Sequence, residues 1–199
     1  MKLAAALAIA ASVLAAPATV RNPSLKLRDI DGVVREPMKA APGQVQALFF
    51  ITDECPVANY YAREIRRICE VYAHRGLGCS LVYVDPATTD EGARKHAAEY
   101  GHGAYPKLVD RDHSLVNVLK PQITPTAVVI RSDATIAYKG RIDNSFAAVG
   151  VPRRVVTEHD LRGALDAVFA GRSVAKAEAP VIGCYIDDLR PKHPNASGR

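Results

Sequence analysis

The chain has 199 residues, of which 48% are hydrophobic and 24% are charged, and its formal net charge is +5. This length and composition predict one soluble globular domain with a core of its own. The basic residues are scattered and no basic stripe is interleaved with aromatic residues, so we expect no nucleic-acid partner. The net charge is that of an ordinary solvated surface.

The first 18 residues differ from the rest of the chain. The segment "MKLAAALAIAASVLAAPA" combines Lys2, an apolar run and small residues, which is the layout of a secretory signal peptide. Cleavage after Ala18, or after Ala16, leaves a mature chain of charge +4 (5 − 1). The apolar run over 3–16 is short for a membrane span of about 20 residues, although an uncleaved anchor is the alternative. We expect a periplasmic or secreted protein without a membrane contact after cleavage of residues 1–18.

The next segments predict a hairpin, a buried strand and an amphipathic helix. The stretch "LKLRDIDGVV" (25–34) predicts a hairpin about its Asp-Gly pair. An apolar run over 45–51 predicts a strand that is buried on both faces. Over 57–74 the apolar residues recur in steps of three and four, which predicts a helix that ends before Gly76.

The middle of the chain alternates short strands with helices. The stretch "CSLVYVD" (79–85) predicts a strand, and "TTDEGARKHAAEYG" predicts a helix capped by Thr89 or Asp90. A short strand over 107–110 and a short helix over 112–120 follow.

The last third predicts an antiparallel strand pair and one more helix. The stretch "TPTAVVIRSDATIAYKG" (124–140) predicts two strands joined by a turn, and "TEHDLRGALDAVFAG" (157–171) predicts a helix with Thr157 as its N-cap. This order of elements predicts an α/β fold over 19–171, with a central mixed β-sheet flanked by helices on both faces. Residues 172–199 form a polar tail with one apolar island, "VIGCYI".

One cysteine stands where a buried strand turns into a helix. Cys55 follows the predicted strand, and Pro56 suits the first turn of the helix that begins there. The free N–H groups and the dipole of a helix N-terminus stabilise a thiolate, the form that attacks disulfides and peroxides. The carboxylates of Asp53 and Glu54 oppose this, and Arg141 would offset them if the fold brings it close. The pattern predicts redox or nucleophilic chemistry, with a buried structural cysteine as the alternative.

Two places in the chain resemble the thioredoxin-like superfamily. The first is the strand–Cys55–helix element, and the second is the sequence Thr124-Pro125-Thr126 before an apolar strand. The resemblance covers about residues 25–171 and implies a thioredoxin-like fold. It also implies that Pro125 is a cis-proline lying against the active cysteine, where Thr124 and Pro125 shape a substrate groove. A trans proline in a turn is the alternative.

Several motifs in order resemble one group of bacterial redoxin-domain proteins, related to AhpC/TSA-like peroxiredoxins and to thiol–disulfide oxidoreductases. These motifs are "TDECPVAN", "TPTAVVI", "YKGRIDN", "HDLRGALDAVFAG" and "GCYI". The resemblance implies a protein thiol or disulfide, or a peroxide, as the partner, and no cofactor. The chain departs from thioredoxins because Ala58 stands where a CxxC motif has its second cysteine. Thr52 matches the T-x-x-C pattern of peroxiredoxins, whose upstream proline is replaced by Leu48.

A lone active cysteine needs a second thiol to complete a redox cycle. Cys184 is the candidate, because it lies in the apolar island of the tail, where Gly183 would allow a close backbone approach. An exposed Cys184, or one paired elsewhere, is the alternative. For Cys69 and Cys79, ten residues apart (79 − 69), a structural disulfide closing the helix–strand connection is expected, and two buried thiols are the alternative.

These features predict an exported thiol–disulfide oxidoreductase with Cys55 as nucleophile and Cys184 as resolving thiol, assisted by Arg141. A peroxiredoxin-like peroxidase, in which Thr52 binds the peroxide and Arg141 assists O–O cleavage, is the first alternative. The others are a copper chaperone of the Sco type, with Cu(I) on Cys55, Cys184 and His159, and a non-catalytic redoxin module.

Overall fold

The structure is a computed structural model and describes residues 25–187. The predicted signal peptide (1–18) and the end of the tail (188–199) lie outside the described residues. Among the helices of the described part, none is both long and apolar enough to cross a membrane.

A mixed five-stranded sheet forms the centre of the molecule, in the order β5-β4-β3-β7-β8. Its strands are β3 (Val45–Ile51), β4 (Leu77–Tyr83), β5 (Lys107–Val109), β7 (Thr126–Arg131) and β8 (Ile136–Gly140). Strands β3, β4 and β5 are parallel, whereas β7 and β8 run antiparallel to their neighbours. Phe49 of the central strand β3 lies opposite Leu81 on one side and Ala127 on the other. The predicted α/β class with a mixed sheet is confirmed.

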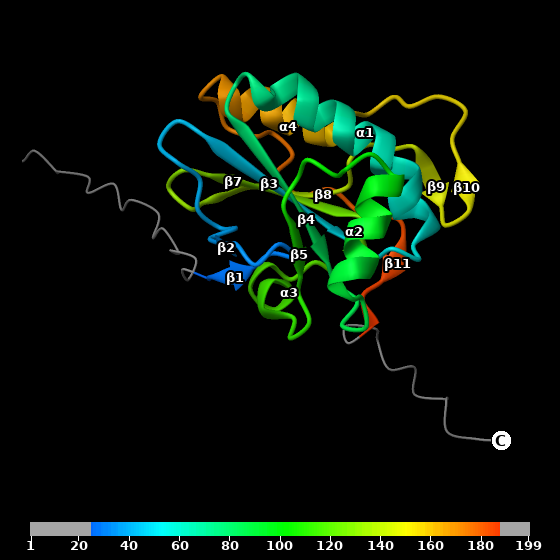
Figure 1. The fold of residues 1–199 in the computed structure, drawn as a ribbon. Helices are drawn as coiled ribbons and strands as arrows, with labels where there is room; N and C mark the ends of the chain where they lie inside the picture. The colour runs from blue at the N-terminus through cyan, green and yellow to red at the C-terminus, as the bar shows by residue number, and fades with distance from the viewer. Residues whose placement is uncertain (1–24, 188–199) are drawn as a thin grey trace, which may run out of the picture.

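Helices cover both faces of this sheet (Figure 1). They are α1 (Pro56–Ala73), α2 (Asp90–Glu99), α3 (Ser114–Leu119) and α4 (Asp160–Phe169). Successive side chains of a strand point to opposite faces, so Phe49 packs in the cluster with α1, α2 and α4. Its neighbours Leu48 and Phe50 pack in the cluster with α3. The apolar residues of β3 therefore fill two core layers.

Helix α1 lies beside α4 and is held to the sheet by its apolar stripe (Figure 1). The buried residues of this stripe recur at helical spacing: Val57, Ala58, Tyr61, Ala62, Ile65, Ile68, Cys69 and Tyr72. A disulfide joins Cys69 of α1 to Cys79 of β4. Closing a loop of this length stabilises the fold by about 2–3 kcal/mol. The disulfide therefore fixes the C-terminal half of α1, and Cys55 lies at the opposite end.

The start of α4 differs from the sequence prediction. The helix begins at Asp160 after His159, and Thr157 is not its N-cap. Instead, Asn144 donates from its Nδ2 to the Thr157 hydroxyl oxygen at 2.8 Å and accepts from the Thr157 N–H at 3.0 Å. Because Asn144 takes both polar groups of Thr157, the N-cap lies two residues later than predicted.

Short strand pairs surround the main sheet. They are β1 (Leu27–Arg28) with β2 (Val34–Arg35), β9 (Phe146–Ala148) with β10 (Val151–Pro152), and β6 (Ile123–Thr124) with β11 (Cys184–Tyr185). The predicted N-terminal hairpin is confirmed, and it lies on the edge strand β5, where the Ile30 N–H donates to the Lys107 carbonyl at 3.0 Å. The strands β9 and β10 lie in the segment between β8 and α4.

The described part of the tail lies on the opposite edge of the sheet. The Lys139 N–H of β8 donates to the Ala177 carbonyl at 2.9 Å, and the Ala179 N–H donates to the Lys139 carbonyl at 3.2 Å. Ala179 approaches Gly140 so closely that a Cβ at that glycine would overlap the Ala179 backbone. Further along the tail, Ile186 is buried in the cluster with α3. Through Ala177 and Ala179, the tail is thus in contact with the domain before the apolar island begins.

Candidate functional site

The strand–helix turn places the sulfur of Cys55 at the N-terminus of α1. Cys55 is the N-cap residue, and its Sγ accepts a hydrogen bond from the Ala58 N–H at 3.4 Å. Its own N–H donates to the Thr52 carbonyl at 3.3 Å, which closes the turn. The residue is 1% exposed. The helix N–H group and the positive end of the helix dipole therefore act on this sulfur in a largely dry environment.

The loop before β7 lies against this sulfur. The Thr124–Pro125 peptide bond is cis. The Cys55 thiol donates to the Thr124 carbonyl oxygen, with 3.6 Å between Sγ and oxygen. The two sequence features that carried the resemblance, 69 residues apart, thus meet in the structure.

Cys184 reaches the same loop from the tail. Strand β11 pairs antiparallel with β6, and Cys184 lies opposite Thr124. The Thr124 hydroxyl donates to the Cys184 carbonyl at 3.4 Å. Gly183 lies against the Thr124 carbonyl, and a Cβ at this position would overlap it. Cys55 and Cys184 both carry thiols, and both lie next to Thr124.

A small pocket of about 230 Å³ connects the two cysteines. Its walls come from the Cys55 turn, from the loop after β4 and from the tail: Thr52, Glu54, Cys55, Val84, Asp85, Pro86, Cys184, Tyr185, Ile186 and Asp187. These lining residues include three carboxylic acids and no Lys or Arg. The predicted site residues Thr52, Cys55 and Cys184 therefore share one cavity.

Arg141 lies elsewhere, contrary to the expectation that it would assist Cys55. Its Nε donates to Asp160 at 2.7 Å and its Nη2 donates to Glu158 at 2.8 Å. Although burial acts to raise the pKa of Asp160, hydrogen bonds from Arg141 and Lys176 hold it below its usual range. The guanidinium is committed to the segment around the start of α4, and the described contacts of Arg141 do not include the Cys55 pocket.

His159 is also apart from the two thiols, contrary to the copper alternative. It lines a larger cavity of about 1200 Å³ between α1 and α4, whose lining residues include no cysteine. Within residues 25–187, no three His, Cys, Asp or Glu side chains lie close enough together to hold a metal ion. Cys55, Cys184 and His159 are therefore not arranged as a copper site in this structure.

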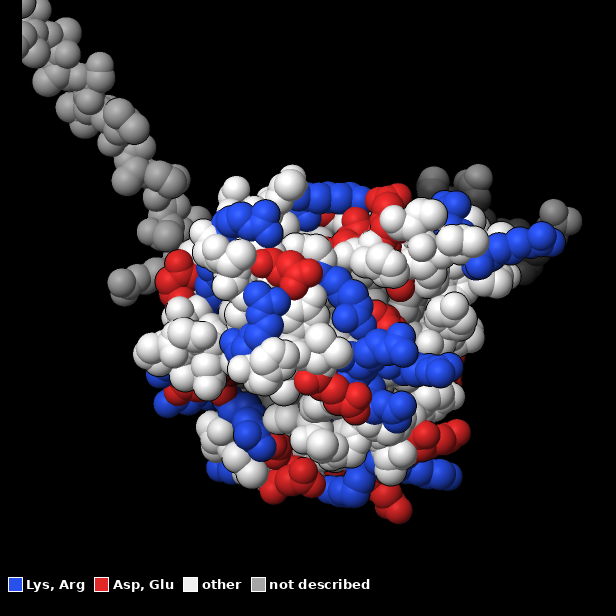
Figure 2. Space-filling model, turned by 90° about the horizontal axis from the view of Figure 1, so that it is seen from above, with Lys and Arg blue, Asp and Glu red and all other residues white. Residues whose placement is uncertain are grey.

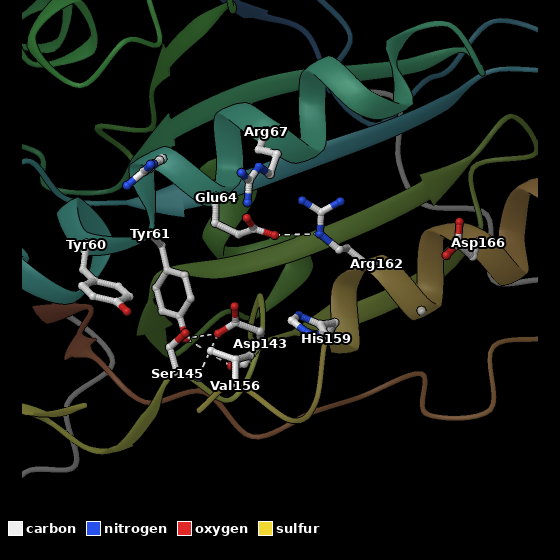
Figure 3. Close-up of a pocket in the computed structure, with 12 residues that line it drawn as sticks. Tyr60, Tyr61, Glu64, Arg67, Asp143, Ser145, Val156, His159, Arg162 and Asp166 are labelled. Atoms are coloured by element: carbon white, nitrogen blue, oxygen red, sulfur yellow. Dashed lines mark hydrogen bonds and ion pairs between the residues drawn. The ribbon is translucent and has the colours of Figure 1, made fainter. Parts of the chain in front are cut away.

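Several polar groups of the larger cavity bind one another (Figure 3). Arg162 of α4 donates to Glu64 of α1 at 2.7 Å, and the Tyr61 hydroxyl donates to the Asp143 carboxylate at 2.8 Å. Burial, and next the Asp143 carboxylate, raise the pKa of Tyr61 above its usual range. Viewed from above, basic side chains gather across the middle of this face with acidic ones among them (Figure 2). This face carries mixed charge, whereas Cys55 and Cys184 line the smaller pocket.

A buried hydrogen-bonded network, which sequence reasoning missed, supports the Cys55 turn from behind. Asn59 donates from Nδ2 to the Asp53 carbonyl at 2.8 Å, and its Oδ1 lies 2.9 Å from His96 Nε2. The other ring nitrogen of His96 lies 2.9 Å from the Tyr83 hydroxyl. Burial lowers the pKa of His96, so the neutral ring is favoured. The one signal for this network in the sequence is that Asn59 and His96 lie on predicted helices.

Comparison with known proteins identifies the fold. No protein-family model and no curated protein matches the chain. An uncharacterized conserved protein from Geobacillus kaustophilus is 27% identical, with a TM-score of 0.71 over 83% of this chain and 89% of that chain. A hypothetical protein from Sinorhizobium meliloti is 24% identical, with a TM-score of 0.70 over 87% of this chain and 94% of that chain. The thioredoxin domain of a thiol-disulfide oxidoreductase from Bacteroides vulgatus is 15% identical, with a TM-score of 0.50 over 59% of this chain and 84% of that chain. The chain therefore has a thioredoxin-like fold, with solved thiol-disulfide oxidoreductases among its structural neighbours.

Proposed function

We propose that the protein is an exported thiol–disulfide oxidoreductase in which Cys55 is the nucleophile and Cys184 is the resolving thiol. The observation that carries the proposal is that both cysteines lie next to Thr124, Cys55 through its thiol and Cys184 through its backbone. Cys55 contacts the Thr124 carbonyl, Cys184 pairs with the Thr124 backbone, and both cysteines line one pocket. Thiol exchange needs a stabilised thiolate and a second thiol within reach, and this arrangement supplies both.

The proposed reaction is two successive exchanges. The Cys55 thiolate attacks one sulfur of a substrate disulfide, a Cys55–substrate disulfide forms, and the other substrate sulfur leaves as a thiolate. The Cys184 thiolate then attacks the Cys55 sulfur, which releases the second substrate thiolate and leaves a Cys55–Cys184 disulfide. The two protons of the protein thiols end on the two released thiols. The substrate disulfide gains two electrons, the protein dithiol loses them, and the reverse sequence oxidises a substrate dithiol.

Each part of the site has a role in these two exchanges. The Ala58 N–H and the α1 dipole stabilise the thiolate of Cys55. Thr124 and Pro125 form the wall against which a substrate lies beside the sulfur. The electrons come from the two thiols, so no cofactor is required. The partner is then a thiol or disulfide, on a protein or on a small molecule.

The proposed compartment is the periplasm or the exterior, after removal of residues 1–18, with the redoxin domain over 19–171 and the Cys184-bearing tail over 172–199. The Cys69–Cys79 disulfide supports this proposal, because structural disulfides persist in oxidising compartments.

A thiol peroxidase is the second candidate, favoured by Thr52, which lines the Cys55 pocket. In that reaction Cys55 would take one peroxide oxygen to form a sulfenic acid and release an alcohol or water, and Cys184 would condense with it and release water. The position of Arg141 argues against this reading, because among residues 25–187 no arginine lines the pocket to assist O–O cleavage.

Peptide mapping of the non-reduced protein tests the proposal. The reduced protein is treated with a small excess of bis(2-hydroxyethyl) disulfide, digested, and analysed by mass spectrometry. We expect a Cys55–Cys184 linkage beside an unchanged Cys69–Cys79 linkage, and no consumption of the reagent by a Cys55→Ser variant. A Cys55–Cys69 linkage, or a Cys55 that stays reduced, would exclude the proposed cycle. Rapid stoichiometric loss of the Cys55 thiol with hydrogen peroxide, and slow loss with the disulfide, would favour the peroxidase.

A further inference from the structure

The tail occupies a backbone edge right beside the proposed nucleophile. Strand β11 pairs with β6, and the next tail residue continues the contact, because the Ile186 N–H donates to the Gln122 carbonyl at 3.1 Å. The edge runs from Gln122 to Thr124, and Thr124 is the residue whose carbonyl contacts the Cys55 sulfur. A polypeptide that adds to this edge would therefore compete with residues 182–186 for the same hydrogen bonds.

Two residues, Gly183 and Ile186, hold the tail on the β6 edge. Gly183 lies where any Cβ would overlap the Thr124 carbonyl, so the backbones of tail and loop can touch. Ile186 is 1% exposed and packs in the core cluster with α3. Gly183 sets the close approach and Ile186 supplies the apolar anchor, on either side of the paired strand.

The docked tail leaves a restricted opening to the sulfur. Cys55 is 1% exposed, and the pocket beside it measures about 230 Å³, with tail residues as one wall. Such a volume is below the range of about 300–1,000 Å³ typical of drug-sized ligands. A compact disulfide of a few heavy atoms can enter it, whereas an extended polypeptide also needs the β6 edge for its backbone.

We propose that residues 182–186 select substrates by size, with Gly183 and Ile186 as the specificity-determining residues. Small disulfides or thiols reach Cys55 while the tail is docked, and an extended protein segment reaches it only after β11 has left β6. This inference rests on the proposed function, since it takes Cys55 as the reacting thiol. It adds that the tail, besides carrying Cys184, occupies the place of a protein substrate.

The test compares two probes on the full chain, in a Cys184→Ser background so that Cys55 is the remaining thiol. The small probe is bis(2-hydroxyethyl) disulfide and the protein probe is insulin, and mass spectrometry measures the rate at which each forms a mixed disulfide with Cys55. Ile186→Ala removes most of the anchor, and Gly183→Ala forces the tail from Thr124 by a different route. Ile136→Ala is the matched control, because Ile136 is an exposed residue of β8.

We expect Ile186→Ala and Gly183→Ala to raise the insulin rate at least about fivefold, because the fraction of chains with an open edge rises. The rate with the small disulfide should change less than about twofold, since that probe does not need the edge, and Ile136→Ala should change neither rate. Circular dichroism checks that each variant is folded. If Ile186→Ala does not fold, the comparison rests on Gly183→Ala.

The outcomes separate this inference from the proposed function. Equal increases with both probes, or an unchanged insulin rate in the folded variants, would overturn the size selection and leave the chemistry of Cys55 intact. No reaction of Cys55 with either probe in any variant would instead overturn the proposed function, and the inference with it.

Discussion

The sulfur of Cys55 and the backbone of Cys184 both contact one residue, Thr124. The Thr124 carbonyl accepts from the Cys55 thiol at 3.6 Å, and the Thr124 hydroxyl donates to the Cys184 carbonyl at 3.4 Å. Thr124 thereby joins a strand–helix turn from the first third of the chain to a tail residue near its end. The predictions below test this junction and the structure around it.

Removal of Cys184 should stop the cycle half-way. With bis(2-hydroxyethyl) disulfide, the reduced wild-type chain is expected to release two equivalents of 2-mercaptoethanol, since Cys184 displaces the second one from Cys55. A Cys184→Ser variant should release one equivalent and keep the other as a mixed disulfide on Cys55, visible in the intact mass. Release of two equivalents by this variant would show that Cys184 is not the resolving thiol.

Arg141 should matter for stability and not for the chemistry of Cys55. Asp160 is almost fully buried, with its side chain 4% exposed, so loss of its Arg141 hydrogen bond in Arg141→Ala should lower the free energy of unfolding by about 1–3 kcal/mol. Urea unfolding measures this loss. In Arg141→Ala, the rate at which Cys55 reacts with a small disulfide should change less than about twofold. The same limit is expected for Arg153→Ala, a control at an exposed position. A rate loss beyond about tenfold in Arg141→Ala would place this residue back at the thiolate.

The network behind the Cys55 turn should respond to loss of Asn59. Asn59→Ala leaves the Asp53 carbonyl and the His96 ring without one partner each, which we expect to cost about 1–3 kcal/mol in urea unfolding. Asn117→Ala, at an exposed position of α3, is the matched control and should lie within about 0.5 kcal/mol of wild type. Equal stabilities for the two variants would show that the network contributes nothing.

The buried ring of His102 should make the protein sensitive to mild acid. Burial, and next the nearby positive charges, lower its pKa to about 4 from an unfolded value of 6.5. Between these values the unfolded chain binds a proton that the folded chain does not, so stability rises with pH through this window and is fully present above 6.5. The contribution lost on acidification to about pH 4 is on the order of 3 kcal/mol.

A His102→Leu variant should therefore show a flatter stability profile between about pH 4 and 6.5 than wild type, measured by urea unfolding at several pH values. His74→Leu, at the exposed C-cap of α1, should keep the wild-type slope. Identical slopes for His102→Leu and wild type would show that His102 does not carry the effect.

The sequence predicts local elements of this fold well where the pattern is strong. The apolar run of β3 and the helical spacing of α1 coincide with the observed elements to within a residue. The start of α4 was placed wrongly, because Asn144 binds Thr157 from a distance of 13 residues. A capping side chain chooses among partners that only the tertiary structure brings near.

In the candidate site, too, local features can be predicted from the sequence, whereas contacts between distant residues cannot. The position of Cys55 at a helix start can be predicted from adjacent residues, and the cis bond at Pro125 agrees with the resemblance to the thioredoxin-like superfamily. The placement of Arg141 could not be read, since Asp160 and Glu158 compete for its guanidinium through contacts set by the loop before α4. The partners of His96 were equally hidden, because two of them, Asn59 and Tyr83, lie on other elements.

The two ends of the described chain also shield the rims of the central sheet. The N-terminal hairpin lies along β5 through Ile30 and Lys107, and the tail lies along β8 through Ala177, Ala179 and Lys139. Exposed sheet rims are the usual templates for unwanted pairing between copies of a protein. Conditions that lift the tail would uncover one such template together with the Cys55 sulfur, so self-association and altered thiol reactivity should arise together.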